Sequence, residues 1–374
     1  GPGVSWIDWN DDGFSDVAIP SGRGGKTGLY LNDKKGGFKK LDLESLNKSS
    51  IRDQVALLEL DSSKRELLVL QSNYEDGLTV GVAIEKHIIN SSTPLNLLDA
   101  GEIAFSVFCS SDYDGDGDLD LFVGGRCVTG SYPASVDSLL LENINGDFQV
   151  NKNQQESLSE IGSVSSAVWT DVLGDNLPEL IISCDPGMIL IFQNNDGVLI
   201  NVTKKVGLNN AIGFWNSVNS GDFNGDGRID LICGNLGGNS GYEIFRDRDL
   251  VWHVGDLSGG GINDVFESYY PRTVGELSPI RTYPETLSAI PFLREVFSNY
   301  SDYASANTSQ LLEGQIGELR QININKIESV IYLNHGGRFE MKDLPINAQL
   351  SPVFGISVSD FDGDGFEDAF LAQN

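Results

Sequence analysis

The sequence has few of the residues that most often carry catalysis. It contains three histidines and four cysteines among 374 residues. No histidine lies in HExxH-type spacing or in a motif that pairs it with a serine or cysteine nucleophile, and the cysteines lack the spacing of a metal-binding motif. We therefore expect a protein that is not an enzyme. The histidines are His87, His253 and His335.

Positive charge is also scarce. The chain has 25 lysine and arginine residues against 54 aspartate and glutamate residues, which gives a formal net charge of −29. Such a charge repels nucleic acids and anionic membrane surfaces, so neither is an expected partner. No apolar run is long enough to span a bilayer, and no signal peptide is visible.

Aspartate and glycine recur together in a nine-residue pattern, Asp-x-(Asp/Asn)-x-Asp-Gly-x-x-Asp. The pattern begins at Asp8, Asp112, Asp222 and Asp360. Oxygen ligands at alternate positions point into a tight turn, and the glycine permits the bend, as a hard cation such as Ca²⁺ requires. Because so many carboxylates repel one another without a counter-ion, the four loops predict about four bound calcium ions.

The predicted side-chain ligands are the first, third, fifth and ninth residues of each loop. They are Asp8, Asn10, Asp12 and Asp16; Asp112, Asp114, Asp116 and Asp120; Asp222, Asn224, Asp226 and Asp230; and Asp360, Asp362, Asp364 and Asp368. EF-hands begin similarly but close with an acid at position twelve, which here is always apolar. The ninth residue must therefore close the site. Acidic turns that bind no metal remain the alternative.

Degenerate copies of the pattern lie between the complete ones. They begin at Asp61, Asp171 and Asp256, and most starting points are about fifty residues apart, a period typical of β-propeller blades. Each repeat has a strand before the loop and one after it, and most have a third strand, often ending in Asn, and a fourth. Seven starting points predict an all-β, seven-bladed β-propeller that forms one domain over residues 1–374. Whether the degenerate loops hold metal stays open.

The long interval before the last repeat contains an insertion at about 275–320. Leu287, Ile290, Leu293 and Phe297 follow one another at three- and four-residue steps, which predicts an amphipathic helix. Pro291 limits the pattern to two shorter helices or a kinked one. The sequence therefore predicts a small helical insertion in the propeller.

Two features of the repeats leave alternatives open. Cys127, Cys184 and Cys233 lie at odd offsets on equivalent strands and therefore on one face, where buried free thiols and disulfides are equally compatible with the pattern. The last repeat reaches Asn374 after two strands. Its outer strands are then missing, supplied by the N-terminal segment, or lost with C-terminal sequence.

The loops and their flanks resemble the FG-GAP (VCBS) repeats of integrin α-subunits and of many bacterial exported proteins. Segments 112–133, 214–240 and 290–297 are more similar to the propeller of the cartilage acidic protein family. The resemblance implies that each calcium is bound by the four side chains and by the carbonyl of the seventh residue. It also implies a secreted or cell-surface protein, in agreement with the high extracellular calcium that weak sites need. The carbonyls belong to Phe14, Asp118, Arg228 and Phe366.

The longest connections are expected at the end of the propeller opposite the calcium loops. They carry arginine and aromatic residues, which are frequent in recognition surfaces, and we predict ligand contacts from Arg126, Tyr132, Trp215 and Arg281. The sequence thus predicts an exported, monomeric module that binds an extracellular protein or glycan. One alternative is a polysaccharide-active hydrolase or lyase with a pocket on this face. In another, the insertion caps the central channel and these residues pack it shut.

Overall fold

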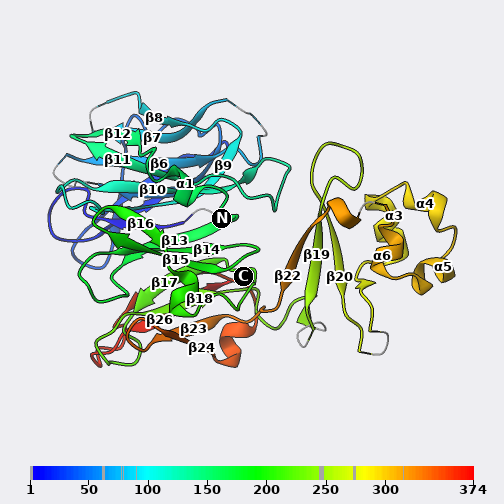
Figure 1. Ribbon diagram of the computed structural model, residues 1–374. Coiled ribbons are helices and arrows are strands. Elements are labelled where there is room, and N and C mark those ends of the chain that lie inside the picture. The colour runs from blue at the N-terminus through cyan, green and yellow to red at the C-terminus, as the bar shows by residue number, and fades with distance from the viewer. Residues whose placement is uncertain are drawn as a thin grey trace.

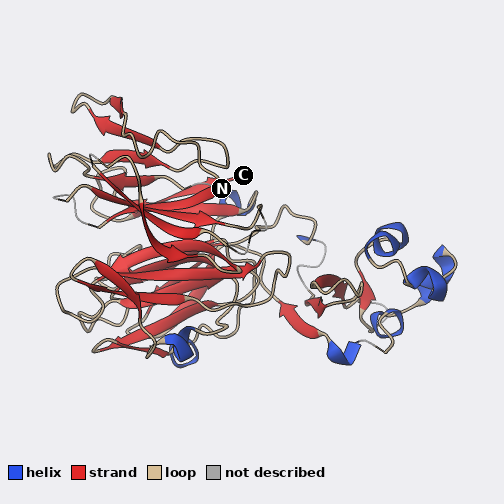
Figure 2. Cartoon of the chain, turned by 90° about the horizontal axis from the view of Figure 1, so that it is seen from above, coloured by secondary structure: helices blue, strands red, loops and turns tan. Residues whose placement is uncertain are grey.

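The computed structural model consists mainly of antiparallel β-sheets (Figure 1), so the predicted all-β class is confirmed. It describes residues 3–60, 64–76, 78, 80–89, 91–243, 248–272, 275–314 and 316–374. Six sheets form a body. A seventh sheet and most of the helices form a lobe that lies beside the body in both views (Figures 1 and 2).

The first four sheets of the body follow the chain directly, each with four strands in sequence order. The first strand of each sheet packs against the first strand of the next, which is the radial arrangement of a β-propeller. The strands are β1 (Ser5–Ile7), β2 (Asp16–Ile19), β3 (Gly28–Asn32) and β4 (Phe38–Leu41); β5 (Asp53–Glu59), β6 (Glu66–Ser72), β7 (Val82–Ile88) and β8 (Leu95–Asp99); β9 (Ile103–Ser111), β10 (Asp120–Val128), β11 (Leu139–Ile144) and β12 (Asp147–Val150); and β13 (Val164–Thr170), β14 (Glu179–Cys184), β15 (Ile189–Asn195) and β16 (Val198–Asn201). Two short helices, α1 (Gln155–Leu158) and α2 (Thr203–Val206), follow the third and fourth sheets.

The fifth sheet is interrupted and the sixth has two strands. In the fifth, β17 (Ser217–Gly221) pairs with β18 (Asp230–Gly234), and β18 pairs with β23 (Val330–Asn334), which lies about a hundred residues further along the chain and pairs with β24 (Phe339–Asp343). The sixth contains β25 (Val353–Ser359) and β26 (Asp368–Gln373), after the 3₁₀ helix η3 (Ile346–Gln349). The inner strands pack in the order β1, β5, β9, β13, β17, β25.

The core lies between neighbouring sheets. Because both faces of a blade are covered by its neighbours, the second strands read as continuous apolar runs rather than as alternating ones. Leu67–Leu70, Leu121–Val123 and Leu180–Ile182 are all completely buried. Burial of the described parts of the second strands therefore stabilises the packing of blade against blade. The acidic loops lie at the ends of these strands.

The lobe is inserted between β18 and β23. Its sheet has the order β21-β20-β19-β22, and helices cover one face. The strands are β19 (Leu250–Gly255), β20 (Asp264–Tyr269), β21 (Ser278–Pro279) and β22 (Arg320–Ile324). The helices are α3 (Tyr283–Ala289), α4 (Leu293–Val296), α5 (Tyr300–Ser305), α6 (Thr308–Leu311) and the 3₁₀ helix η2 (Ile316–Glu318). Pro291 falls in the break between α3 and α4, where the sequence places one.

The sequence pattern predicts a blade at the repeat that begins at Asp256, and this prediction is wrong. Asp256 lies in the loop between β19 and β20, within the lobe's own sheet. An acidic hairpin loop has the same local pattern in any antiparallel sheet, so the pattern alone does not say which sheet contains it. Among the described residues, the body therefore contains six sheets rather than seven.

The structure also bears on the expectations for the cysteines and for membrane-spanning segments. All four cysteines are free thiols, and Cys127, Cys184 and Cys233 are buried, which decides between the two open alternatives. In the parts of the chain that the structure describes, no helix is both long and apolar enough to cross a membrane.

Candidate metal centres

The acidic loops join the first two strands of their sheets and share one backbone shape. In the four complete loops, the fourth residue has a φ of 56–78° and the sixth residue, always glycine, a φ of 81–95°. These values lie in the left-handed region, which glycine adopts without strain. The degenerate loop at Asp171 has the same shape, with Gly174 at 76° and Asn176 at 69°.

The first aspartate of each loop accepts hydrogen bonds from the loop's own backbone. The N–H of the sixth residue donates to its Oδ2, at 2.8 Å from Gly13 to Asp8 and 3.1 Å from Gly117 to Asp112. The loops at Asp222 and Asp360 repeat this bond at 2.8 and 3.0 Å. The bond holds the first carboxylate against the turn, on the side where the other ligand positions lie.

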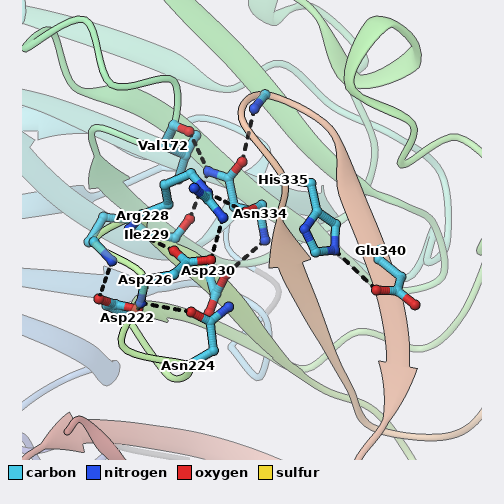
Figure 3. Close-up of polar contacts among 12 residues, drawn as sticks. Val172, Asp222, Asn224, Asp226, Arg228, Ile229, Asp230, Asn334, His335 and Glu340 are labelled. Carbon is cyan, nitrogen blue, oxygen red and sulfur yellow. Dashed lines mark hydrogen bonds and ion pairs between the residues drawn. The ribbon is translucent and has the colours of Figure 1, made fainter.

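The seventh residues also lie at the turn. Each donates its backbone N–H to the aspartate at the fifth position, at 2.9–3.0 Å. These seventh residues are Phe14, Asp118, Arg228 and Phe366. In the loop at Asp222, the Arg228 guanidinium also pairs with Asp226 and donates to the carbonyl of Asn334 (Figure 3).

The ninth residue closes three of the complete loops from inside the sheet. Asp16, Asp120 and Asp230 are the first residues of β2, β10 and β18, and their exposed fractions are 0%, 1% and 0%. One oxygen of each accepts the backbone N–H of an asparagine near the end of the third strand, at 2.7–2.8 Å. The end of the loop is thereby fastened to the third strand of its own sheet.

Asn334 shows how this third-strand asparagine works. Its N–H donates to Asp230, and its side-chain amide donates to the carbonyl of Ile229 at 3.0 Å and to that of Val172, in the loop of the previous sheet, at 2.7 Å (Figure 3). Asn32 and Asn143 make the same bonds within their own sheets. These asparagines therefore position the closing acids.

The second oxygen of each closing carboxylate is left without a partner. The Oδ2 atoms of Asp16, Asp120 and Asp230 are buried and have no hydrogen bond among the described residues, and the same holds for Oδ1 of Asn10 and of Asp112. A buried, unpaired polar atom costs about 1–3 kcal/mol, and more when it is charged. A cation in the loop would supply the missing partner, so these residues fit a metal.

Burial also raises the pKa of the closing acids. The pKa of Asp120 rises to about 7, mainly because the carboxyl is desolvated, and the negative charges of Asp114 and Asp116 raise it further. Desolvation likewise raises the pKa of Asp16 and of Asp230. The protein alone therefore disfavours the ionised form, whereas a bound cation would favour it.

Two complete loops bring three carboxylates together. The acid oxygens of Asp112, Asp114 and Asp120 lie within 4.8 Å of one another, and so do those of Asp360, Asp362 and Asp368. The two sets differ in burial, since Asp120 is buried and Asp368 is half-buried. In the loops at Asp8 and Asp222 the third ligand position is an asparagine, whose amide oxygen takes the place of one carboxylate.

The degenerate loop at Asp171 forms a third carboxylate cluster. Acid oxygens of Asp171, Asp175 and Glu179 lie within 4.8 Å of one another. Glu179 is 0% exposed, its Oε1 has no partner among the described residues, and burial raises its pKa to about 7. Leu173 replaces a ligand in the pattern, and the other oxygen of Glu179 accepts the backbone N–H groups of Val172 and Leu173, both at 3.1 Å, rather than that of a third-strand asparagine. The degenerate loop at Asp61 lies outside the described residues.

Sequence reasoning missed one acid beside the loop at Asp8. Glu59 ends β5 of the second sheet and accepts the N–H of Asp8 at 3.0 Å. Its Oε1 is buried without a partner among the described residues, and burial raises its pKa, with further repulsion from Asp8 and Asp16. Glu59 belongs to no pattern and reaches the loop only because two blades pack together, so no sequence signal marks it.

The FG-GAP-like repeat family matches residues 171–233 of the chain. The chain contains an FG-GAP-like repeat. The match runs from the degenerate loop at Asp171, through the complete loop at Asp222, to Cys233 in β18. No curated protein matches the chain significantly. The predicted FG-GAP repeat is thus confirmed, while the closer relation to the cartilage acidic protein family stays a prediction.

Solved structures similar to this FG-GAP-like chain share little sequence with it. The biofilm matrix protein Bap1 of V. cholerae is 12% identical, with a TM-score of 0.40, over 100% of this chain and 77% of that one. An Agrocybe aegerita lectin that recognises non-reducing terminal N-acetylglucosamine is 14% identical, with a TM-score of 0.40, over 100% and 85%. Sqt1 of Saccharomyces cerevisiae is 11% identical, with a TM-score of 0.37, over 70% of this chain and 57% of that one.

The predicted ligand-contacting residues lie away from the FG-GAP loops. Arg126 pairs with Asp185 and lies over the ring of Tyr132, whose hydroxyl donates to the same carboxylate at 3.3 Å. Arg281 pairs with Glu267 in the lobe. Trp215 is 0% exposed and packs in the core between the fourth and fifth sheets, so it is a core residue and not a surface one, which corrects the prediction.

Proposed function

We propose that this chain is an exported, calcium-stabilised β-propeller that binds a protein or a glycan and catalyses no reaction. The observation that carries the calcium proposal is the set of buried carboxylate oxygens without partners at Asp16, Asp120 and Asp230. Oxygen-rich turns with an inward carboxylate suit Ca²⁺, which takes six to eight oxygen ligands. We assign one ion to each complete loop and extend the proposal to the loop at Asp171, because Glu179 also has a buried oxygen without a partner among the described residues and lies in a cluster of three acids.

In this proposal calcium acts mechanically. Each ion fastens the turn between the first two strands of a blade and neutralises carboxylates that repel one another. The loops at Asp112 and Asp171 each contain three clustered acids, so without a cation both the repulsion and the desolvation of the closing acid oppose folding. Loops that bind weakly are filled where calcium is in the millimolar range, which supports the proposed extracellular location.

Thermal unfolding in calcium and in excess chelator tests this function. Each ion that binds only the folded state contributes RT ln(1 + [L]/Kd), about 2.7 kcal/mol at a hundredfold excess over Kd, so several ions should raise Tm by roughly 10 °C or more. Magnesium at the same concentration is the control, because it tolerates such irregular loops poorly. Equal unfolding temperatures in calcium and chelator, with no calcium detected by metal analysis, would refute the proposal.

The binding part of the proposal concerns the side of the body away from the loops. The loop 360–367, red at the end of the colour bar, points away from the lobe (Figure 1). Arg126, Tyr132 and Asp185 lie where the lobe meets the body, and Tyr132 contacts Trp252 of the lobe with ring centroids 6.5 Å apart. The insertion therefore covers part of this face and adds its own surface to it.

The proposal that the chain is not an enzyme rests on how its buried acids are engaged. Outside the loops, Glu267 lines a cavity, but one of its oxygens accepts from Arg281 and the other from Tyr242. An acid held in this way suits ligand recognition better than proton transfer. The remaining clustered carboxylates among the described residues belong to the acidic loops.

A further inference from the structure

The lobe contains a cavity of about 460 Å³ between its sheet and helix α3. One wall comes from β19 and β20, and the other from α3 and the segment before it. This volume is within the range of about 300–1,000 Å³ found for small-molecule sites. Its lining includes Tyr242, Trp252, Phe266, Glu267, Arg281 and Glu285.

A buried carboxylate and a guanidinium meet in this cavity. Glu267 is 6% exposed, and its oxygens accept from the Tyr242 hydroxyl and from Nε of Arg281. The Arg281 side chain is 57% exposed, and among the described contacts its terminal nitrogens make no hydrogen bond. The cavity therefore offers acceptor and donor atoms side by side.

The aromatic wall of the cavity is held by the propeller body. Trp252 and Tyr242 both contact Phe214, which precedes β17, with ring centroids 5.1 and 5.5 Å apart. Tyr132 packs edge-on against Trp252. Because two loops of the body support these rings, the cavity wall is preformed rather than created by a ligand.

The opposite wall is fixed by capping and by a hydroxyl bond. Thr282 and Glu285 form a capping box at the start of α3, and Thr286 is within 2.7 Å of the Tyr303 hydroxyl. The Tyr303 hydroxyl also lies 2.8 Å from the carbonyl of Arg281, to which it donates. The donor and acceptor groups thus lie on rigid elements.

We propose that this cavity binds a neutral sugar ring. A pyranose has hydroxyl groups that both donate and accept, which match the neighbouring carboxylate of Glu267 and guanidinium of Arg281, and apolar C–H faces that match the aromatic wall. Glu267, Glu285 and Arg281 together carry one net negative charge, so the cavity repels uronates and sulfated sugars. The inference names a glycan site for the proposed function and rests on it.

Titration of the full chain in calcium with neutral and acidic oligosaccharides tests the proposal. The neutral panel consists of gluco-, galacto- and manno-oligosaccharides, the acidic arm is oligogalacturonate, and isothermal calorimetry and saturation-transfer NMR report binding. We expect saturable binding of a neutral sugar and none of the acidic one. Glu267→Gln and Arg281→Gln should each weaken binding by roughly tenfold or more.

Two further variants distinguish a loss of sugar binding from a loss of folding. Ala289 is an exposed residue of α3 on the cavity wall, so Ala289→Trp should fill the cavity and abolish binding without disturbing the sheet. Arg294, exposed on α4 and outside the cavity, provides the matched control Arg294→Gln, which should bind as the unmodified chain does. Unfolding curves of all variants in calcium verify that they are folded.

The outcomes separate the two proposals. A calcium-dependent Tm without binding of any neutral sugar overturns the cavity proposal and leaves the calcium scaffold intact. Neutral-sugar binding that Ala289→Trp does not reduce, or tighter binding of oligogalacturonate, also overturns it. Shortened oligosaccharides after incubation would instead refute the proposal that the chain is not an enzyme.

Discussion

The acidic loops at Asp112 in the body and Asp256 in the lobe share a backbone but differ in their surroundings. The fourth and sixth residues of the lobe loop, Gly259 and Gly261, have φ values of 74° and 78°, close to those in the body. Asp256 accepts the N–H of Gly261 at 2.8 Å, the bond that Asp112 accepts from Gly117. Turn geometry is therefore the same in both regions.

The two loops differ in their closing acids, which are Asp264 in the lobe and Asp120 in the body. Asp264 of the lobe is half-buried, and one of its oxygens accepts the N–H of Ser258 at 2.7 Å. Its strand, β20, pairs on its outer side with β21, which has two residues and ends in no asparagine. Asp120 instead is buried by a full third strand and keeps one oxygen unpaired among the described residues. The burial of the closing acid, on which the proposed cation sites rest, thus depends on the strands around the loop as well as on the loop itself.

The largest expected effect separates these two loops directly. Asp114→Ala should lower the free energy of unfolding in calcium by about 2–3 kcal/mol, because one ion is lost, and leave it unchanged or higher in chelator. Ser258→Ala, the matched position in the lobe, should show no dependence on calcium. Chemical denaturation in calcium and in chelator measures both. Equal destabilisation by Asp114→Ala in the two conditions would contradict the mechanism.

The loop at Asp360 provides an intermediate case. It has the full set of acids, but its closing Asp368 is half-buried, since among the described residues no third strand pairs with β26. Asp362→Ala should therefore have the same sign as Asp114→Ala with a smaller loss, below about 1 kcal/mol. A loss as large as that of Asp114→Ala would show that burial of the closing acid does not set the affinity.

Glu179→Gln tests whether the degenerate loop belongs with the body's sites. In calcium the variant should lose about 2 kcal/mol, because the closing ligand is weakened. In chelator it should gain stability by up to about 1 kcal/mol, since a buried charge is removed. Denaturation curves in calcium and in chelator measure both changes. A loss of stability of the same size in chelator would mean that Glu179 stabilises the fold without binding calcium.

Asn143→Ala tests the role of the third strand. The Asn143 side chain donates to the carbonyl of Leu119 at 3.1 Å and accepts the N–H of Gly146 at 2.7 Å. Loss of these bonds should destabilise the chain by about 1–2 kcal/mol. Calcium affinity should fall as well, because Asp120 is less firmly held. Asn209→Ala, an exposed position, is the control and should change neither quantity.

The last prediction concerns the dependence of the lobe's stability on pH. His253 is 0% exposed, and desolvation lowers its pKa below the usual 6.5. The unfolded chain therefore binds a proton before the folded one does, so the lobe loses stability as the pH falls below about 6.5, by at most about 1.4 kcal/mol per unit. Hydrogen exchange at pH 7.5 and 5.5, corrected for intrinsic rates, should show less protection in β19 and β20 at the lower pH. His253→Phe should remove the change, and an equal loss in β13 and β14 would contradict its assignment to the lobe.

Much of the body could be predicted from short-range patterns of residues. The four complete loops, the strands on either side of them and the asparagines that end third strands are all visible in the pattern of residues. The pattern at Asp256 predicts a blade because its loop obeys the same local rules, whereas the loop lies in the sheet of the lobe. The place of Trp215 in a connection predicts a surface residue, yet packing of the fourth and fifth sheets buries it.

The sequence by itself determined the turns and their candidate ligands, because nine adjacent residues suffice to bend the backbone and to supply the oxygens. Only the tertiary structure decided which loops have a desolvated closing acid, since that depends on strands from elsewhere in the chain and, for Glu59 at the loop of Asp8, on a neighbouring sheet. The cavity of the lobe likewise depends on tertiary structure, because its walls come from separate segments of the insertion that meet only when the insertion folds, and Phe214 of the body packs against two of its rings.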